Sequence, residues 1–156
     1  LSRGASGFRL DVADELPDEL IEELRKAVNA HGPDKLLMGE VWEDATTKIA
    51  YDKRRTYLLG KGLDCVMNYP FRNAVLDFLR GRPVEEIADR ILSICENYPA
   101  PALHCLMNFL STHDTERAIT ALAGESSEGH DRYWQSGRRL SAVQYERGIK
   151  MLTMAP

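Results

Sequence analysis

The chain has 156 residues, of which 44% are hydrophobic and 28% are charged, and its formal net charge at pH 7 is −4. This is the composition of an ordinary globular protein, and the negative charge argues against nucleic acid as a partner. No apolar run approaches the roughly 20 residues of a membrane-spanning helix, and the N-terminus has no signal-like pattern, so no membrane partner is expected.

Strand-like and helix-like segments alternate along the chain. Short apolar runs that are typical of buried strands occupy residues 7–12, 36–41, 63–68 and 105–110. Apolar residues recur at helical spacing between and after these runs, which predicts helices over residues 17–28, 71–80, 84–97, 116–123 and 137–154. Strands joined by helical crossovers are parallel. The predicted fold is therefore α/β, with four consecutive parallel β/α units.

Chain length limits how much of a barrel these units can form. A complete (β/α)₈ barrel needs about 200 to 250 residues. The chain begins at Leu1 without an initiator Met and stops directly after a helical pattern, so we expect residues 1–156 to be one truncated half of a (β/α)₈ barrel, with no second domain. Four strands leave two unpaired edges and an uncovered inner face, and such a fragment is expected to self-associate.

Two loops interrupt the alternation, a polar one at residues 43–61 and a Gly- and Ser-containing one at residues 124–129. The first carries a basic run, Lys53, Arg54 and Arg55. We interpret this run as solvated surface rather than as a binding patch.

Cysteine and histidine positions do not suggest a metal site. Cys65, Cys95 and Cys105 are far apart and lie in apolar segments, which predicts buried, reduced thiols and a cytoplasmic location. Three of the histidines are isolated and are interpreted as surface or hydrogen-bonded core residues, namely His31, His104 and His130. No metal or cofactor is expected.

An acidic residue follows or closes three of the four predicted strands: Asp11, Glu40 and Asp114. A carboxylate beside a buried strand costs free energy to desolvate unless it is paired or hydrogen-bonded. In parallel barrels the catalytic groups come from the C-terminal ends of several strands. The three positions therefore predict an active site at one rim of the sheet.

The two carboxylates of the first strands have different predicted surroundings. Alternation along the first strand puts Arg9 on the same face as Asp11, and a guanidinium there should keep the carboxylate ionised, as a nucleophile requires. Glu40 has apolar neighbours in sequence, which favour the neutral form that a general acid needs. A structural ion pair for Asp11 and a capping or loop-facing role for Glu40 remain the alternatives. One charged and one protonatable carboxyl are the working pair of glycoside hydrolysis.

Four segments resemble motifs of the α-amylase family of retaining glycoside hydrolases, in particular its neopullulanase, cyclomaltodextrinase and maltogenic amylase branch. The run from Gly7 to Glu15 is similar to the family's strand-four motif, and Gly39-Glu40-Val41-Trp42 to its strand-five motif. Ser111-Thr112-His113-Asp114 resembles the strand-seven motif, and Met67-Asn68-Tyr69-Pro70-Phe71 a segment after strand six of this branch. Order and spacing agree throughout.

This resemblance implies a role for each matched residue. Asp11 would be the nucleophile, Glu40 the acid/base and Asp114 the transition-state stabiliser. Arg9 would orient the nucleophile, and His113 would bind the sugar that is cleaved. Trp42 would stack on an acceptor sugar, although a wall residue packed on the next loop is the alternative.

The resemblance also has gaps. The family's strand-one motif has no counterpart here, nor have the lid after strand three, strand eight and the C-terminal β domain. The resemblance therefore implies that residues 1–156 are the C-terminal half of the catalytic barrel, from strand four to the helix before strand eight, truncated at both ends. The missing parts supply the calcium ligands of typical α-amylases, so the resemblance implies no metal site in this chain. The implied function is cleavage of α-1,4-glucosidic bonds in maltooligosaccharides, cyclodextrins or pullulan, and the isolated fragment is expected to be inactive. A transglycosylase of the same family and a non-catalytic glucan-binding relative are the alternatives.

Overall fold

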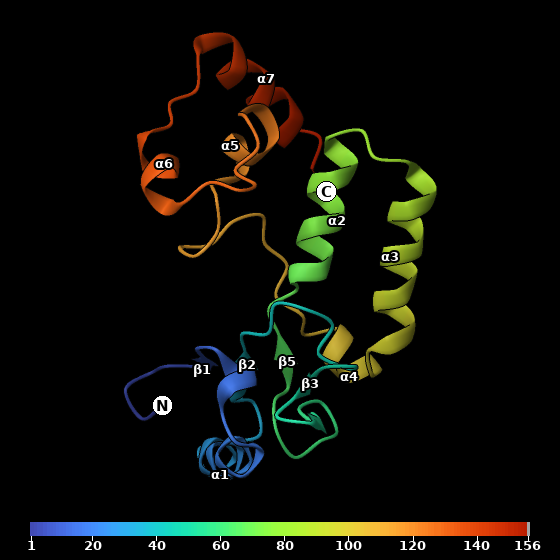
Figure 1. The fold of residues 1–156 in the computed structure, drawn as a ribbon. Coiled ribbons are helices and arrows are strands. Elements are labelled where there is room, and N and C mark those ends of the chain that lie inside the picture. Colours follow the sequence, from blue (N-terminus) through green and yellow to red (C-terminus); the bar gives the residue numbers. More distant parts are fainter. Residues whose placement is uncertain (156) are drawn as a thin grey trace. The chain divides into compact units, whose positions relative to one another are not determined.

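The computed structural model describes residues 1–155 and consists of two compact units. Leu1–Phe71 and Arg90–Asn108 form the first unit, and the second contains Arg72–Asp89 and the chain from Phe109 onward. The elements of each unit are labelled in Figure 1. Among the described residues no helix is both long and apolar enough to cross a membrane.

A parallel sheet forms the centre of the first unit. Its strands are β1 (Gly7–Leu10), β2 (Leu36–Gly39) and β5 (Cys65–Val66), in the order β1-β2-β5. Leu10 is paired with Gly39, and Gly39 with Val66, so the three strands end close to one edge. The predicted parallel pairing of the first three strands is confirmed.

The predicted fourth strand is reduced to a single parallel bridge between Met67 and Met107. The run 105–110 begins in a helical turn, because the amides of Cys105 and Leu106 still bond to carbonyl oxygens of Ala102 and Leu103 at the end of α4 (Ala100–Leu103). Prediction of a full strand there was wrong. Helix α4, which the apolar pattern did not indicate, occupies the residues just before this run.

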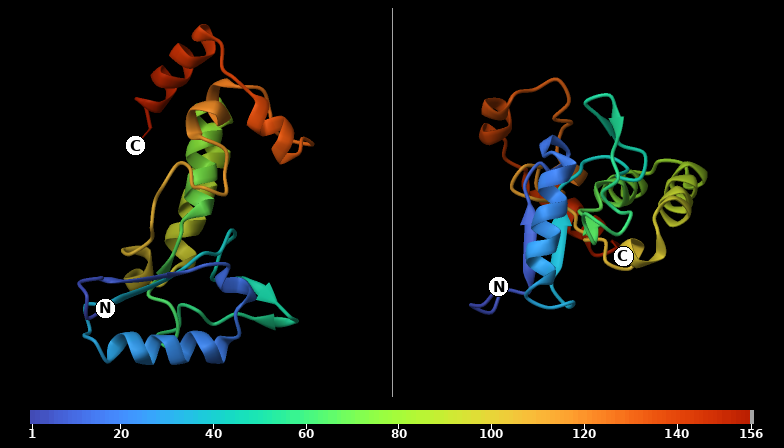
Figure 2. Two further views of the ribbon diagram at one scale, coloured as in Figure 1. Left: turned by 90° about the vertical axis from the view of Figure 1, so that its left-hand side faces the viewer. Right: turned by 90° about the horizontal axis from the view of Figure 1, so that it is seen from below.

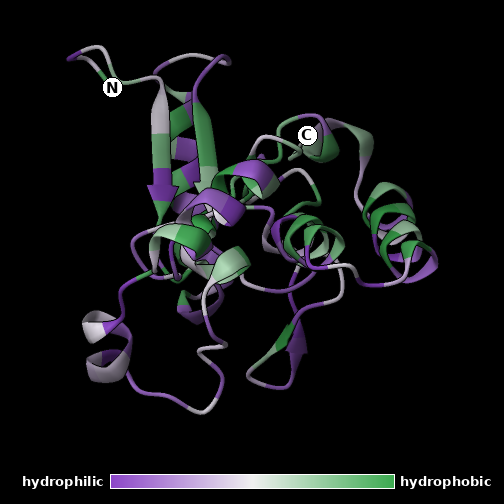
Figure 3. Ribbon diagram, turned by 90° about the horizontal axis from the view of Figure 1, so that it is seen from above, coloured by the Kyte–Doolittle hydropathy of each residue, from purple (hydrophilic) through white to green (hydrophobic). Residues whose placement is uncertain are grey.

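Helix α1 (Asp18–Asn29) covers one face of this sheet, as predicted for residues 17–28. Ile21 and Val28 are buried in the same core as Leu37 of β2. The right-hand view of Figure 2 shows α1 lying along β1 and β2, and Figure 3 shows β2 in the hydrophobic colour. The amphipathic pattern of α1 therefore anchors the strands that carry the predicted site.

A buried arginine ties α1 to the N-terminal ends of the strands. Arg25 donates to the carbonyl oxygen of Lys35 at 2.9 Å and pairs with the carboxylate of Asp64. The same Asp64 carboxylate accepts a hydrogen bond from the backbone amide of Leu37 at 2.7 Å. Because Lys35 and Asp64 directly precede β2 and β5, this cluster lies at the end of the strands opposite to Glu40.

The segment predicted as the polar loop 43–61 contains a small antiparallel hairpin, β3 (Ile49–Ala50) and β4 (Lys53–Arg54). Its turn residues, Tyr51 and Asp52, both have positive φ angles of 52° and 60°, as hairpin turns that match strand twist require. Arg55 directly follows the hairpin and is buried, with only 5% of its surface exposed. The interpretation of the basic run as solvated surface is therefore wrong for Arg55.

The remaining helices follow the predicted positions closely until the last one. Helices α2 (Tyr69–Leu79), α3 (Val84–Asn97) and α5 (Ala118–Ala123) confirm three predictions. The predicted helix over residues 137–154 is present as α7 (Ala142–Leu152), which begins later than predicted, and a helix that was not predicted, α6 (Arg132–Gly137), precedes it. Ser141 starts α7 with a reciprocal capping box to Gln144, which fixes a helix start where the prediction had a helix interior.

The core of the second unit lies between α2, α5 and α7. It consists of Leu76, Ala121 and Leu122, with Met151 and Leu152 packed against them. Gly148 of α7 is buried, and a methyl group there would lie 3.1 Å from the Ala123 side chain of α5. The lack of a side chain at Gly148 therefore allows the two helices to pack closely.

Cysteine exposure differs from the expectation. All three thiols are free, but only Cys65 is buried, whereas Cys95 and Cys105 are exposed. Cys105 lies in the turn after α4 rather than in a strand, and Cys95 lies at an exposed position of α3. Burial raises the pKa of the Cys65 thiol to about 12.

We predict that two of the three thiols react rapidly with a disulfide reagent at pH 8. Cys65 should react slowly, because a thiol with a raised pKa has little thiolate at that pH and is shielded from the reagent. The number of reacted thiols, measured from the chromophore that the reagent releases before and after denaturation, checks this. Fast reaction of all three thiols in the native protein would contradict the burial of Cys65, and Cys65→Ser should leave the fast phase unchanged.

Candidate active site

Asp11 and Glu40 follow neighbouring strands at the same edge of the sheet. Strand pairing continues past the formal strand ends, because the amide of Glu40 donates to the carbonyl oxygen of Leu10 at 3.0 Å. The carbonyl oxygen of Glu40 in turn accepts from the amide of Ala13 at 2.9 Å. The backbone therefore fixes the two acidic residues relative to each other before any side-chain contact is considered.

Arg9 joins the two carboxylates. One guanidinium nitrogen pairs with Asp11, and another lies 2.9 Å from Oε1 of Glu40. The side chain of Asp11 is 70% exposed, whereas that of Glu40 is only 3% exposed. The predicted placement of Arg9 beside Asp11 is confirmed, and the contact between Arg9 and Glu40 is an addition that strand alternation did not predict.

The surroundings of the Glu40 carboxyl are polar, not apolar as predicted. Besides Arg9, Oε1 accepts from the indole nitrogen of Trp42 at 3.1 Å and from the hydroxyl of Tyr69 at 3.2 Å. Oε2 accepts from the backbone amide of Val12 at 3.0 Å. The apolar neighbours of Glu40 in sequence, such as Val41, turn into the core. The buried carboxyl is thus hydrogen-bonded by three donors from distant parts of the chain and by the indole nitrogen of its neighbour Trp42.

Val12 has an unusual backbone conformation at this point. Its φ and ψ angles are 44° and 52°, in the left-handed region, which a β-branched residue rarely adopts. The conformation ends β1, starts the short 3-10 helix η1 (Ala13–Glu15), and aims the Val12 amide at Glu40. Strain of this kind persists only where the surrounding structure holds it, and it is concentrated at functional sites.

Trp42 and Tyr69 stack on each other beside Glu40. Their ring centroids are 4.7 Å apart and their planes differ by 14°. Tyr69 is buried, whereas 47% of the Trp42 surface is exposed. Both interpretations of Trp42 are therefore compatible with the structure, since one part of the ring packs on Tyr69 at the start of α2 and another part faces solvent.

Tyr69 is the site residue that sequence reasoning missed. A usable signal was present, because Tyr69 follows β5 as Glu40 follows β2, and parallel neighbours end at the same edge. Neighbouring Asn68 is buried too, and its side-chain amide donates to Asn108 at 2.9 Å. The segment after β5 thus adds an aromatic hydroxyl to the site.

His113 and Asp114 lie in the second unit. His113 Nε2 is 3.0 Å from Oδ2 of Asp114, and the histidine side chain is 72% exposed. The amide of Asp114 bonds to the hydroxyl of Thr112 at 3.2 Å. The first unit brings together Arg9, Asp11, Glu40 and Trp42. That His113 and Asp114 belong to the same active site as these residues stays a prediction.

No group of three or more histidine, cysteine or acidic side chains within residues 1–155 has the geometry of a metal site. The positive partner of Glu40 is the guanidinium of Arg9.

Comparison with known proteins gives a consistent result. Residues 1–144 match the family model described as alpha amylase, catalytic domain. The chain is 31% identical over 166 residues to an amylopullulanase of Thermoanaerobacterium saccharolyticum, covering 99% of this chain and 12% of that protein. It is 36% identical over 130 residues to neopullulanase 2 of Thermoactinomyces vulgaris, covering 82% of this chain and 21% of that protein.

Solved structures show the same likeness. A cyclic α-maltosyl-(1→6)-maltose hydrolase of Arthrobacter globiformis, in complex with maltose, matches 80% of this chain and 27% of its own, with a TM-score of 0.69 at 28% identity. A cyclomaltodextrinase matches 77% of this chain and 19% of its own, with a TM-score of 0.66 at 36% identity. These likenesses confirm the predicted fold class, a partial (β/α)₈ barrel, and the chain spans well under a third of each relative.

We predict opposite effects of two substitutions at Val12. Asparagine tolerates the left-handed region and keeps the amide that Glu40 needs, so Val12→Asn should stabilise the protein by up to about 1 kcal/mol. Val12→Pro fixes φ near −65° and removes the amide, so it should destabilise the protein by about 3 kcal/mol or more. Denaturant unfolding of both variants checks this, and similar losses in both would contradict the assigned backbone strain.

Proposed function

We propose that this chain, which belongs to the alpha-amylase family, supplies the nucleophile and the acid/base of a retaining glycoside hydrolase that cleaves α-1,4-glucans. The chain spans 12% and 21% of the amylopullulanase and neopullulanase relatives, so the activity is that of the complete polypeptide that carries it. The isolated segment is expected to be inactive.

One observation carries the proposal, namely that a single guanidinium holds an exposed and a buried carboxylate together. Arg9 pairs with Asp11 and with Glu40. Asp11 is open to an incoming sugar, and Glu40 is held by fixed donors beside it. Retaining glycosidases need two carboxyl groups at close range with different environments.

The proposed reaction has two displacement steps. Glu40 gives its proton to the glycosidic oxygen while a carboxylate oxygen of Asp11 attacks the anomeric carbon, so the glycosidic bond breaks and an ester bond to Asp11 forms. Glu40 then takes a proton from water as the water oxygen attacks the same carbon, which breaks the ester and restores both residues. Arg9 orients Asp11 and balances the charge that Asp11 carries before attack.

The partners of Glu40 suggest how it can exchange its proton. The Arg9 guanidinium, the Trp42 indole and the Val12 amide are donors only, so they match the ionised carboxylate. Tyr69 differs, because a hydroxyl can donate to the carboxylate and can accept from the protonated acid. Tyr69 therefore keeps its hydrogen bond to Glu40 in both halves of the cycle.

The second unit contributes to the same proposal through His113 and Asp114. Their contact presents a carboxylate and an imidazole together on an irregular segment after Met107. In the proposed site Asp114 binds hydroxyl groups of the sugar as its ring flattens, and His113 binds the same sugar. The exposed part of Trp42 offers an aromatic surface for the acceptor sugar.

The names of the relatives favour cyclic α-glucans and pullulan as candidate substrates of the complete polypeptide. They include a neopullulanase, a cyclomaltodextrinase and a hydrolase of cyclic maltosyl-maltose. Digestion of cyclodextrin, pullulan and starch by the complete polypeptide, with chromatography of the products, tests this. Products longer than the substrate would identify transfer to sugar rather than to water.

We predict that Asp11→Asn lowers kcat by at least about 10⁴-fold, because an amide cannot form the glycosyl ester. Mass spectrometry of the complete enzyme treated with a fluoro-sugar should locate the adduct on Asp11. Asp34→Asn is the matched control, since Asp34 is an exposed aspartate that pairs with the neighbouring Lys35. An adduct on another residue, or unchanged activity of Asp11→Asn, would refute the nucleophile assignment.

Glu40→Gln should behave differently from Asp11→Asn. Glutamine cannot protonate the leaving group, so kcat on maltooligosaccharides should fall by about 10² to 10⁴-fold. Activated aryl glycosides need no protonation in the first step and should lose much less of that step's rate. Steady-state and burst kinetics on both substrates measure this, with Glu22→Gln on α1 as a surface control. If the rate of the first step fell equally on both substrates, Glu40 would not be the acid.

A further inference from the structure

We propose that Arg55 is a positioning residue for the catalytic pair, acting through the segment that follows Asp11. This inference rests on the proposed function, because it concerns the same two carboxylates. Arg55 lies in the loop between β2 and β5, well away in sequence from Asp11, and it contacts neither carboxylate in the structure.

The guanidinium of Arg55 is fully engaged by one short stretch of chain. Its Nε lies 3.0 Å from the carboxylate of Asp18, and a second nitrogen donates to the carbonyl oxygen of Asp14 at 3.0 Å. The remaining nitrogen donates to the carbonyl oxygen of Leu16. The guanidinium also lies over the ring of Tyr57, 4.7 Å from its centroid. The planar guanidinium holds five N–H donors in a fixed fork, so it can serve these three acceptors at once, whereas a lysine ammonium is a single point of charge on a flexible stem.

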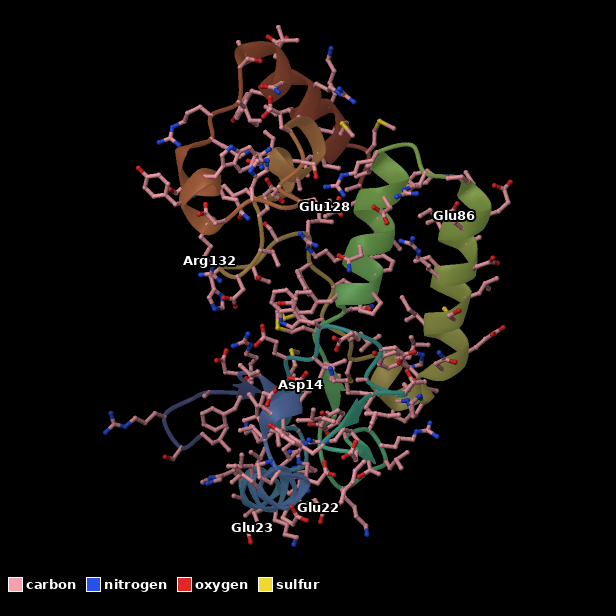
Figure 4. All side chains as sticks on the ribbon, in the orientation of Figure 1. Asp14, Glu22, Glu23, Glu86, Glu128 and Arg132 are labelled. Atoms are coloured by element: carbon pink, nitrogen blue, oxygen red, sulfur yellow. The ribbon has the colours of Figure 1, made fainter. Side chains whose placement is uncertain are left out.

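The stretch that Arg55 holds is the one that fixes Val12. Asp14 belongs to η1, which directly follows Val12, and the amide of Glu15 bonds back to the carbonyl oxygen of Val12 at 3.0 Å. Figure 4 labels Asp14 on this turn. Val12 in turn donates its amide to Glu40, and Ala13 donates to the Glu40 carbonyl oxygen. Arg55 is therefore linked to Glu40 through one continuous backbone segment.

Two further contacts tie the same loop to the same turn. Lys48 lies 3.1 Å from the carboxylate of Asp14, and the hydroxyl of Tyr51 donates to Glu15. Hydrogen bonding to Glu43, at 2.6 Å, is the main cause of a raised pKa for Lys48, so it remains charged at neutral pH. The segment after Glu40 thus returns to bind the segment after Asp11, and Arg55 is the buried member of this link.

Backbone strain explains why the link matters for chemistry. A left-handed valine costs about 1 to 2 kcal/mol, so without support η1 would relax and move the Val12 amide away from Glu40. A displacement of about 1 Å in a reacting group can cost about 10²-fold in rate. Loss of Arg55 should therefore reduce kcat more than it reduces substrate binding.

Arg25 provides a matched control at the other end of the same strands. Like Arg55 it is a buried arginine that pairs with one carboxylate and donates to a backbone carbonyl oxygen. Its partners precede β2 and β5, so they lie on the side away from Glu40. Removing Arg25 should cost stability without disturbing the Val12 amide.

The experiment compares Arg55→Met, Arg55→Lys and Arg25→Met in the complete polypeptide, below the unfolding temperature of each variant. Arg55→Met should lower kcat on maltooligosaccharides by about 10²-fold with little change in KM. Arg55→Lys keeps the charge and part of the hydrogen bonding, so its kcat should lie between those of Arg55→Met and the wild type. Arg25→Met should lower the unfolding temperature and leave kcat near that of the wild type.

Equal loss of kcat in Arg25→Met and Arg55→Met, at equal folded fraction, would overturn the inference, because both arginines would then act on stability alone. If Arg55→Met does not fold, a wild-type kcat in Arg55→Lys would overturn it as well. Failure of the proposed function gives a different result: the wild type would not hydrolyse glucans, or Asp11→Asn would retain activity, whatever happens at Arg55.

Discussion

The pairing of Arg9 with both Asp11 and Glu40 is the interaction on which the rest of the site depends. Two carboxylates at close range repel each other, and burying one of them would be costly without a positive partner. A guanidinium supplies that charge in a planar, forked form that can bind two acceptors at once. Parallel strand pairing then sets the spacing, because Arg9 and the two acids come from adjacent strand ends with a fixed register.

Around this pair the molecule uses backbone groups as much as side chains. Glu40 accepts from the Val12 amide, and its own backbone is bonded to Leu10 and Ala13. Asp64 performs a comparable task at the opposite end, where it joins Arg25 to the amide of Leu37. Each end of β2 is therefore held by an arginine, a carboxylate and a backbone amide. The strand between them is only four residues long, so the two clusters lie close to its whole length.

Much of this could be predicted from local sequence patterns, and the rest depended on contacts between distant residues. Alternation along β1 was enough to pair Arg9 with Asp11, and helical periodicity was enough to place α1, α2 and α3. The donors to Glu40 come from four separate positions in the chain, so its apolar neighbours in sequence gave the wrong environment. Burial of Arg55 depends on Asp18, 37 positions away, which no local pattern records. The break before α7 was different, because Ser141 and Gln144 form a local capping box that could have been recognised.

Dependence of Glu40 on the Val12 amide has a consequence for comparisons between related sequences. Every amino acid except proline carries a backbone N–H, so the group that serves Glu40 does not require any particular side chain at this position. An alignment records side-chain identity, and position 12 could therefore vary among relatives while its contribution to the site stays the same. Constraints of this kind become visible only when backbone conformations, rather than residue types, are compared across a family.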